Sequence, residues 1–169
     1  TQQYDKALKT LSADQHFEPK DMAYVDVLRG EAYVGLKQVE QARQSYQAAL
    51  KQDPKEPLAL VGLAKLAAVA GDTDAAANDV QQALAVAPEN PQAWVAKGNL
   101  AFDSGDIAGA EAAFQKVLDF KNPDWLPQER FYALARLVDA QVQQNHLDKA
   151  LTNIQALEKM SPQHPYAHY

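Results

Sequence analysis

The fold is decided by PLALVGLAKLAAVAGDTDAAANDVQQALAVAPEN, residues 57–90, and by the stretch that follows it, PQAWVAKGNLAFDSGDIAGAEAAFQKVLDFKNPD, residues 91–124. The two stretches have the same length and both begin with proline. Aligning them places Ala76 opposite Ala110, and Ala42 precedes Ala76 by the same interval. A fixed period of this length indicates a repeat architecture in which each unit is one supersecondary element.

Within residues 57–90 the apolar side chains follow the spacing of an amphipathic helix twice. In the first half they are Leu60, Leu63, Ala64 and Ala67, and in the second half they are Ala76, Val80 and Ala83. Spacings of three and four residues place such side chains on one helical face. Gly71 and Asp72 separate the halves, and they suit a left-handed helix end followed by an N-cap. The pattern therefore predicts two helices in each unit.

Two columns of small residues recur with the same period. They are Gly30, Ala64 and Gly98 in the first helices, and Ala42, Ala76 and Ala110 in the second helices. Four residues after each alanine of the second column comes a larger side chain, namely Tyr46, Val80 or Phe114. We expect the small residues to let helices approach closely, with the larger residues filling the space beside them. A single unit cannot bury its apolar stripe alone, so stability must come from stacking on neighbouring units.

This pattern resembles the tetratricopeptide repeat, a helix–turn–helix unit of about 34 residues. The copies span residues 23–56, 57–90, 91–124 and 131–164, while residues 1–19 match the second helix of a truncated repeat and residues 165–169 match the start of a further one. The resemblance implies an all-α fold, a right-handed superhelical solenoid of antiparallel helix pairs, with residues 1–169 forming a single array segment. In the copy at residues 23–56, Asp26 and Arg29 stand where the family prefers apolar residues, which weakens packing there or bends their stems over the core.

The fourth copy is displaced, because Ala150 lies further from Ala110 than the period of the preceding copies predicts. The additional residues fall in 121–130, which contains two prolines and lacks a helical period. This stretch predicts a longer loop, or an extension of the next helix beginning near Leu126. Trp125 within it suits a plug between repeats better than an exposed anchor, because a large indole is rarely left in solvent.

Both ends of the array lack the polar capping face that terminal repeats usually carry. We therefore expect the 169 residues to be a segment of a longer repeat protein. The uncapped ends also leave open a structural role in which copies of the chain associate with one another.

Composition excludes several classes of partner and chemistry. The 16 basic residues are outnumbered by 22 acidic ones, and no basic cluster of the kind that binds nucleic acid is present. The longest apolar stretch, residues 58–70, is interrupted by Lys65 and is too short for a transmembrane segment. With no cysteine, thiol catalysis and cysteine-ligated zinc are excluded.

No catalytic constellation, cofactor site or metal site is predicted. His164 and His168 have a ligand-like spacing, but Pro165 lies between them and no third ligand is near in sequence. The acidic pairs Asp72/Asp74 and Asp103/Asp106 lie beside the turns within repeats, where aspartate caps helices. We therefore expect a protein that is not an enzyme.

The resemblance implies a concave groove lined by the first helices of successive repeats. The predicted groove residues are Tyr24, Val27, Glu31, Lys65, Gln92, Asn99, Phe102, Asp103, Tyr132, Arg136, Asp139 and Gln143. Val27 belongs to a column that could equally pack between adjacent helices. The family's two-carboxylate clamp is not expected, because its lysine column reads Val27, Val61, Val95 and Ala135 here.

Such a groove suits a peptide or a partner helix, so the predicted function is that of a protein-binding scaffold. The style of the repeats resembles that of bacterial envelope lipoproteins of the exopolysaccharide and PEP-CTERM (exosortase) system. This resemblance implies a periplasmic or envelope location and a role in a secretion or polysaccharide-export assembly, with a cytoplasmic location as the alternative. The competing interpretation is a regulatory or targeting arm of a larger enzyme, such as a glycosyltransferase or peptidase.

Overall fold

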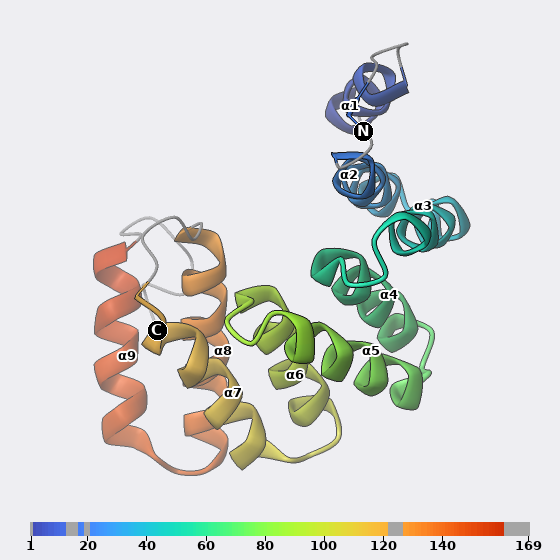
Figure 1. Ribbon diagram of the computed structural model, residues 1–169. Coiled ribbons are helices and arrows are strands. Elements are labelled where there is room, and N and C mark those ends of the chain that lie inside the picture. Colours follow the sequence, from blue (N-terminus) through green and yellow to red (C-terminus); the bar gives the residue numbers. More distant parts are fainter. Residues whose placement is uncertain (1, 13–16, 19–20, 122–126, 161–169) are drawn as a thin grey trace. The chain divides into compact units, whose positions relative to one another are not determined.

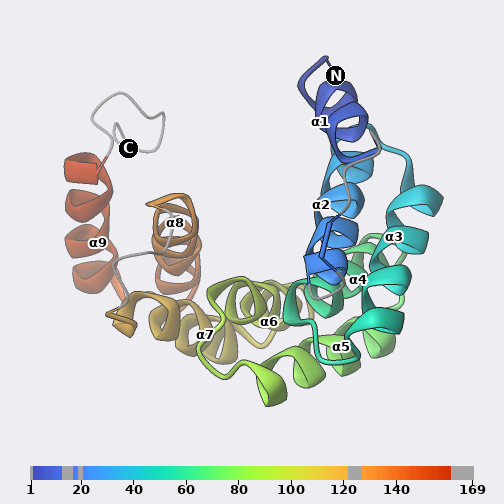
Figure 2. The ribbon, with the colours of Figure 1, turned by 45° about the horizontal axis from the view of Figure 1, so that its top comes forward.

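The computed structural model describes residues 2–12, 17–18, 21–121 and 127–160. Within these residues the chain is all-helical, with nine α-helices and no strand (Figure 1). The helices are α1 (Gln2–Ser12), α2 (Met22–Gly35), α3 (Val39–Gln52), α4 (Pro57–Val69), α5 (Thr73–Val86), α6 (Pro91–Asp103), α7 (Ile107–Asp119), α8 (Pro127–Gln143) and α9 (Leu147–Met160). Consecutive helices form antiparallel pairs, of which α8 and α9 stand side by side in both views (Figure 2).

The chain divides into two compact units, residues 1–88 and residues 89–169. The sequence predicts a single array over 1–169, and the division falls after Pro88, just before the predicted repeat at residues 57–90 ends. Repeat architectures permit such a division, because each repeat is stabilised by its immediate neighbours rather than by a common core. The N-terminal unit contains α1 to α5 and the C-terminal unit contains α6 to α9.

Short polar side chains begin several of the helices, as the turn sequences predict. The carboxylates of Asp72 and Asp106 accept hydrogen bonds from the backbone N–H groups of Ala75 and Gly109, at 3.1 and 2.9 Å. Asn90 caps α6 in the same way, accepting from the N–H of Ala93 at 2.9 Å. The N-cap role predicted for Asp72 and Asp106 is therefore confirmed.

The turn within each helix pair has the same geometry even where its sequence differs. Gly71 and Gly105 have φ angles of 81° and 84°, and Lys37 and Asn145 occupy the matching positions with φ of 60°. Asparagine tolerates this left-handed conformation, but for lysine it costs about 1 kcal/mol. The shared turn shows that the fold, and not glycine, imposes this conformation.

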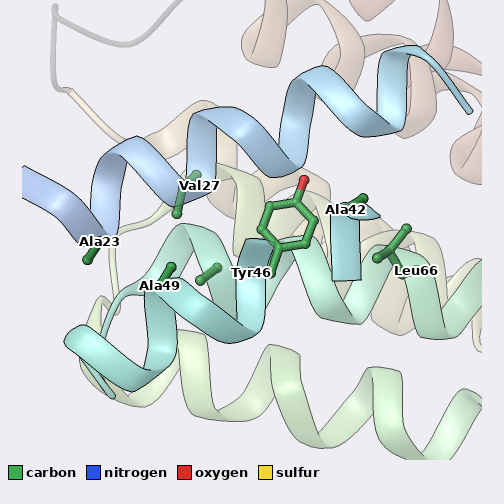
Figure 3. Close-up of a cluster of buried hydrophobic side chains, with 7 residues drawn as sticks. Ala23, Val27, Ala42, Tyr46, Ala49 and Leu66 are labelled. Atoms are coloured by element: carbon green, nitrogen blue, oxygen red, sulfur yellow. The ribbon is translucent and has the colours of Figure 1, made fainter. Parts of the chain in front are cut away.

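The core of the N-terminal unit is built around Tyr46 of α3 (Figure 3). A Cβ atom added to Gly30 of α2 or to Gly62 of α4 would lie 2.5 Å from the Tyr46 ring. Glycine at both positions therefore lets α2 and α4 approach this buried ring closely. Tyr46 is 3% exposed, so the ring has no open space into which it could move.

The C-terminal unit repeats this arrangement with Gly98 of α6 and Phe114 of α7. A Cβ atom added to Gly98 would lie 2.6 Å from the Phe114 ring, which is fully buried. In the repeat without an aromatic residue, the corresponding buried pair is Ala64 and Val80. In these three repeats the size of the first-helix residue thus varies inversely with that of its partner on the second helix, whereas the fourth repeat has Val138 and Ile154 at these positions.

Asp26 and Arg29 form a partly buried polar network rather than an apolar contact. The Asp26 carboxylate accepts hydrogen bonds from Arg29 and from Gln52 of α3, both at 2.7 Å. Arg29 also donates to the backbone carbonyl of Leu11, near the end of α1, at 2.7 Å. The two residues that depart from the apolar pattern therefore connect α1, α2 and α3.

The fourth helix pair begins earlier than residue 131. Helix α8 starts at Pro127, so a loop spanning all of 121–130 is wrong, and the alternative of an extended helix describes residues 127–130. Proline suits the first turn of a helix, where its missing N–H is not needed. Arg130 of this additional turn donates to the carbonyl of Phe120 at the end of α7, at 3.1 Å. The predicted plug, Trp125, lies outside the described residues.

Glu111 of α7 contacts several polar side chains of the last helix pair and of the turn between its helices. Its carboxylate accepts hydrogen bonds from Gln144 at 2.6 Å and Gln141 at 3.3 Å, and lies 3.2 Å from His146 Nδ1 and 3.6 Å from Lys149 Nζ. Burial by itself would raise the pKa of Glu111, but the hydrogen bonds from Gln141 and His146 and the charges of Lys149 and His146 lower it overall. The network joins α7 to the α8–α9 pair.

We expect the Gly98–Phe114 pair to show compensation when both residues change. Gly98→Ala should destabilise the protein by about 1–3 kcal/mol, because the added methyl group meets a ring that cannot move. Phe114→Val should also be destabilising, because it leaves a cavity. The double variant recreates the Ala64–Val80 combination, so its free energy of unfolding in urea should exceed the value expected from adding the two single effects. Additive effects would contradict the size relationship.

We expect Glu111→Gln to lower the free energy of unfolding by about 1 kcal/mol at pH 7. A carboxylate whose pKa is lowered on folding stabilises the protein above its unfolded pKa, near 4.5, and this stabilisation is lost as pH falls through the folded pKa. The difference between variant and wild type should therefore shrink below about pH 4. Urea unfolding followed by circular dichroism at pH 7 and pH 3 measures this. A difference that is the same at both pH values would show that the charge of Glu111 does not stabilise the fold.

Candidate protein-binding face

Eight predicted groove residues lie on α6 and α8, the two first helices of the C-terminal unit. We call the surface formed by these residues the α6–α8 face: Gln92, Asn99, Phe102, Asp103, Tyr132, Arg136, Asp139 and Gln143. Contacts between the two helices run along their length, from Gln92 near the start of α6 to Phe102 near its end. The structure therefore brings most of these residues into one neighbourhood.

Arg136 is the centre of the face. Its guanidinium carbon lies 4.1 Å from the centroid of the Phe102 ring, a distance at which a cation is attracted to the ring's π electrons. Its Nη1 atom donates to Asp139 at 3.3 Å, and its Nε atom donates to Asn99 at 3.4 Å. The Arg136 side chain is 24% exposed, so these contacts occupy most of its surface.

Tyr132 is held at one end while its ring stays open to solvent. Its hydroxyl group donates to the side-chain oxygen of Asn99 at 3.2 Å, and the residue is 43% exposed. Asn99 thus accepts hydrogen bonds from both Tyr132 and Arg136 of the neighbouring first helix. The result is an aromatic ring in a fixed position with area available for contact.

The remaining predicted residues lie at the two ends of the face. Gln92 donates to Glu129 at 3.3 Å, which connects the first turns of α6 and α8. Asp103 and Gln143 are the last residues of α6 and α8, and both are exposed. They are therefore accessible to a partner, although they are not part of the cluster around Arg136.

The N-terminal unit presents Tyr24 and Glu31 on α2 and Lys65 on α4, all exposed. Val27 does not belong with them: it is 1% exposed and packs in the core cluster with Ala23 and Tyr46 (Figure 3). The prediction that Val27 lines a groove is wrong, and the alternative of a packed core position describes it, because its cluster contains residues of α3 and α4. Burial, and then the negative charge of Glu31, raise the pKa of Tyr46 to about 12.

Two further residues of α8 were not predicted from the sequence. Glu129 falls in the stretch assigned to a loop, although its spacing of three residues from Tyr132 suits one helical face. Val142 is 50% exposed near the end of α8, ten residues after Tyr132. Its position corresponds to that of Phe102 in the preceding repeat, which could have identified it.

The parts of the chain that the structure describes contain neither a cluster of potential metal ligands nor a helix suited to crossing a membrane. No group of three or more potential ligands from histidine, aspartate or glutamate is assembled among those residues. The pair His164 and His168 lies outside them. None of the described helices combines the length and the apolar character needed to cross a bilayer.

Solved structures with the same arrangement of helices include PilF from Pseudomonas aeruginosa, with a TM-score of 0.79 and 18% sequence identity. PilW, a widely conserved type IV pilus biogenesis factor, has a TM-score of 0.76 and 23% identity. The matches cover 87% and 86% of this chain, and only 64% of the PilF and of the PilW chain. At these identities the likeness is one of fold.

The first repeat domain of Spaghetti (RPAP3), solved with the HSP90 peptide SRMEEVD, has a TM-score of 0.64 and 19% identity. That match covers 74% of this chain and 97% of the domain. No curated protein sequence matches this chain.

A family model described as tetratricopeptide repeat matches residues 2–57, 27–80 and 61–124. Together these overlapping matches cover well over half of the chain, including the repeats at residues 23–56, 57–90 and 91–124. The helix pairs, the small-to-large contacts between them and the recurring turns agree with this assignment. The chain therefore belongs to the tetratricopeptide repeat family.

Proposed function

We propose that this chain is a non-catalytic scaffold that binds a peptide or a partner helix on its first-helix surface. The observation that carries the proposal is the α6–α8 face, where the ring of Tyr132 is fixed by Asn99 and still 43% exposed. Tyrosine is enriched among the residues that dominate binding energy at protein interfaces. The face therefore provides one specific anchor residue rather than a broadly apolar surface.

The contacts around Arg136 support this function because they prepare the face before a partner arrives. Arg136 covers part of Phe102 and is itself held by Asp139 and Asn99. A partner would not have to order these long side chains on binding, which removes part of the entropic cost of association. In the N-terminal unit, Tyr24, Glu31 and Lys65 are proposed as further contact residues.

We further propose a location in the bacterial envelope and a role in a secretion or polysaccharide-export assembly. The fold likeness to PilF and PilW is compatible with this proposal, since PilW is a type IV pilus biogenesis factor. The repeat style that resembles envelope lipoproteins adds to it. The peptide-bound RPAP3 domain supports the binding mode, because a domain of the same fold holds a peptide.

The binding proposal predicts that Tyr132 matters more than other exposed apolar residues. Peptides selected from a random display library on the wild-type protein should lose about tenfold or more in affinity with Tyr132→Ala, the loss typical of an interface anchor. Tyr132→Phe, which removes only the bond to Asn99, should lose less. Leu151→Ala on α9 is the matched control, because Leu151 is 57% exposed and lies outside the face.

Affinities measured by fluorescence anisotropy distinguish the outcomes. Equal binding by wild type and Tyr132→Ala, for every selected peptide, would contradict the assignment of the α6–α8 face.

The location is tested on the native full-length protein. We expect a tagged copy, expressed from its own gene, to fractionate with the envelope or periplasm, and crosslinking in living cells to join it to secretion or export components. Recovery in the cytosolic fraction alone would overturn the proposed compartment without bearing on peptide binding.

A further inference from the structure

The charges on the α6–α8 face are arranged asymmetrically, and this bears on which partner the proposed function involves. Among its eight residues the charged ones are Asp103, Asp139 and Arg136, so acids outnumber bases. Arg136 is engaged by Asp139, Asn99 and the Phe102 ring. The Arg136–Asp139 pair carries no net charge as a whole, so the eight residues have a net charge of −1, and the carboxylate is the more exposed member of the pair, at 42% against 24% for Arg136.

Both carboxylates remain accessible. The Asp139 side chain is 42% exposed although one of its oxygen atoms receives Arg136. Asp103 is exposed as the last residue of α6. The carboxyl end of a helix carries a partial negative charge, so Asp103 adds to the potential that α6 already produces there. This end of the face attracts cations and repels carboxylates.

Exposed apolar side chains lie on α8 to either side of Asp139. Tyr132 is seven residues before Asp139 and Val142 is three residues after it, and both are about half exposed. At 1.5 Å per residue, these three side chains are spaced about 10 and 5 Å apart along the helix axis. An apolar, acidic, apolar order of this kind fits a partner with an apolar, basic, apolar order.

We propose that the α6–α8 face selects a cationic amphipathic helix, with a lysine or arginine placed between two apolar residues that lie about three turns apart. The cation would contact Asp139 and Asp103, and the apolar residues would contact Tyr132 and Val142. This proposal rests on the proposed function and specifies its partner. It also makes an acidic tail a poor ligand here, because the guanidinium that could receive a carboxylate is already stacked and paired.

Three synthetic peptides of about 18 residues, or roughly 27 Å of helix, test the charge preference. They share the same leucine positions and differ only in carrying lysine, glutamate or glutamine at the polar positions of one face. In fluorescence anisotropy titrations at low salt, the lysine peptide should bind at least about tenfold more tightly than the glutamate peptide. The difference should shrink at about 0.5 M salt, because exposed charges are screened.

Variants of the face locate the effect. Asp103→Asn should weaken binding of the lysine peptide about threefold, the range of a partly exposed ion pair, and leave the glutamine peptide unchanged. Asp139→Asn should act in the same direction. Asp148→Asn on α9 is the matched control, because it removes an exposed carboxylate outside the face. Circular dichroism melting confirms that each variant is folded.

The possible failures are distinguishable. If the lysine peptide binds no more tightly than the glutamate peptide, the charge preference is overturned. If, in addition, peptide binding is unaffected by Tyr132→Ala, the proposed function of the face fails as well. If the lysine and glutamate peptides bind the wild type equally and Tyr132→Ala abolishes binding of both, the face binds partners but does not select their charge.

Discussion

The structure depends on the close contact between a small residue of one helix and a large residue of the next. Tyr46 lies against Gly30 and Gly62, and Phe114 lies against Gly98, at distances that leave no room for a methyl group. Such contacts bring the helix backbones together and bury the rings, so that Tyr46 is 3% exposed and Phe114 0% exposed. The apolar area buried in this way offsets the conformational entropy lost in ordering separate short helices.

This constraint also positions the binding face. Gly98 of α6 packs against the Phe114 ring of α7. The guanidinium carbon of Arg136 lies 5.8 Å from the centroid of the same ring. Asn99 follows Gly98 directly, so the same contact that brings α6 against α7 places Asn99 near Tyr132 and Arg136. The placement of α6 against α7 therefore determines both the packing of the core and the positions of side chains on the α6–α8 face.

Much of this fold could be predicted from the period of the repeat, because helical spacing, capping residues and small columns all point to the same helix pairs. The prediction failed where a pattern admits two structures. Prolines in 121–130 suggest a loop, yet Pro127 begins a helix, since proline is equally at home in a first helical turn. An apolar residue at the repeat position of Val27 suits either a core or a groove, and only its burial in the structure distinguishes the two.

The sequence predicted which residues belong to the candidate site better than it predicted the contacts between them. Spacing identified Asn99, Phe102, Tyr132 and Arg136, because first-helix positions recur with the repeat. No spacing rule could show that Arg136 stacks on Phe102 or that Asn99 receives two donors, since these contacts depend on side-chain torsions chosen during packing. The network around Glu111 is similar, because Gln141 lies 30 residues after Glu111 and no spacing rule pairs the two side chains.

The bond from Arg29 to the carbonyl of Leu11 has a consequence for how the N-terminal unit opens. If α1 moved away, Arg29 would lose one acceptor, and the buried carboxylate of Asp26 would depend on a less constrained guanidinium. Local unfolding of α1 is thus coupled to the electrostatic environment inside α2 and α3, beyond the simple loss of apolar contact. In a family whose repeats communicate mainly through nearest-neighbour packing, this polar link gives α1 and the first full repeat a shared cooperativity.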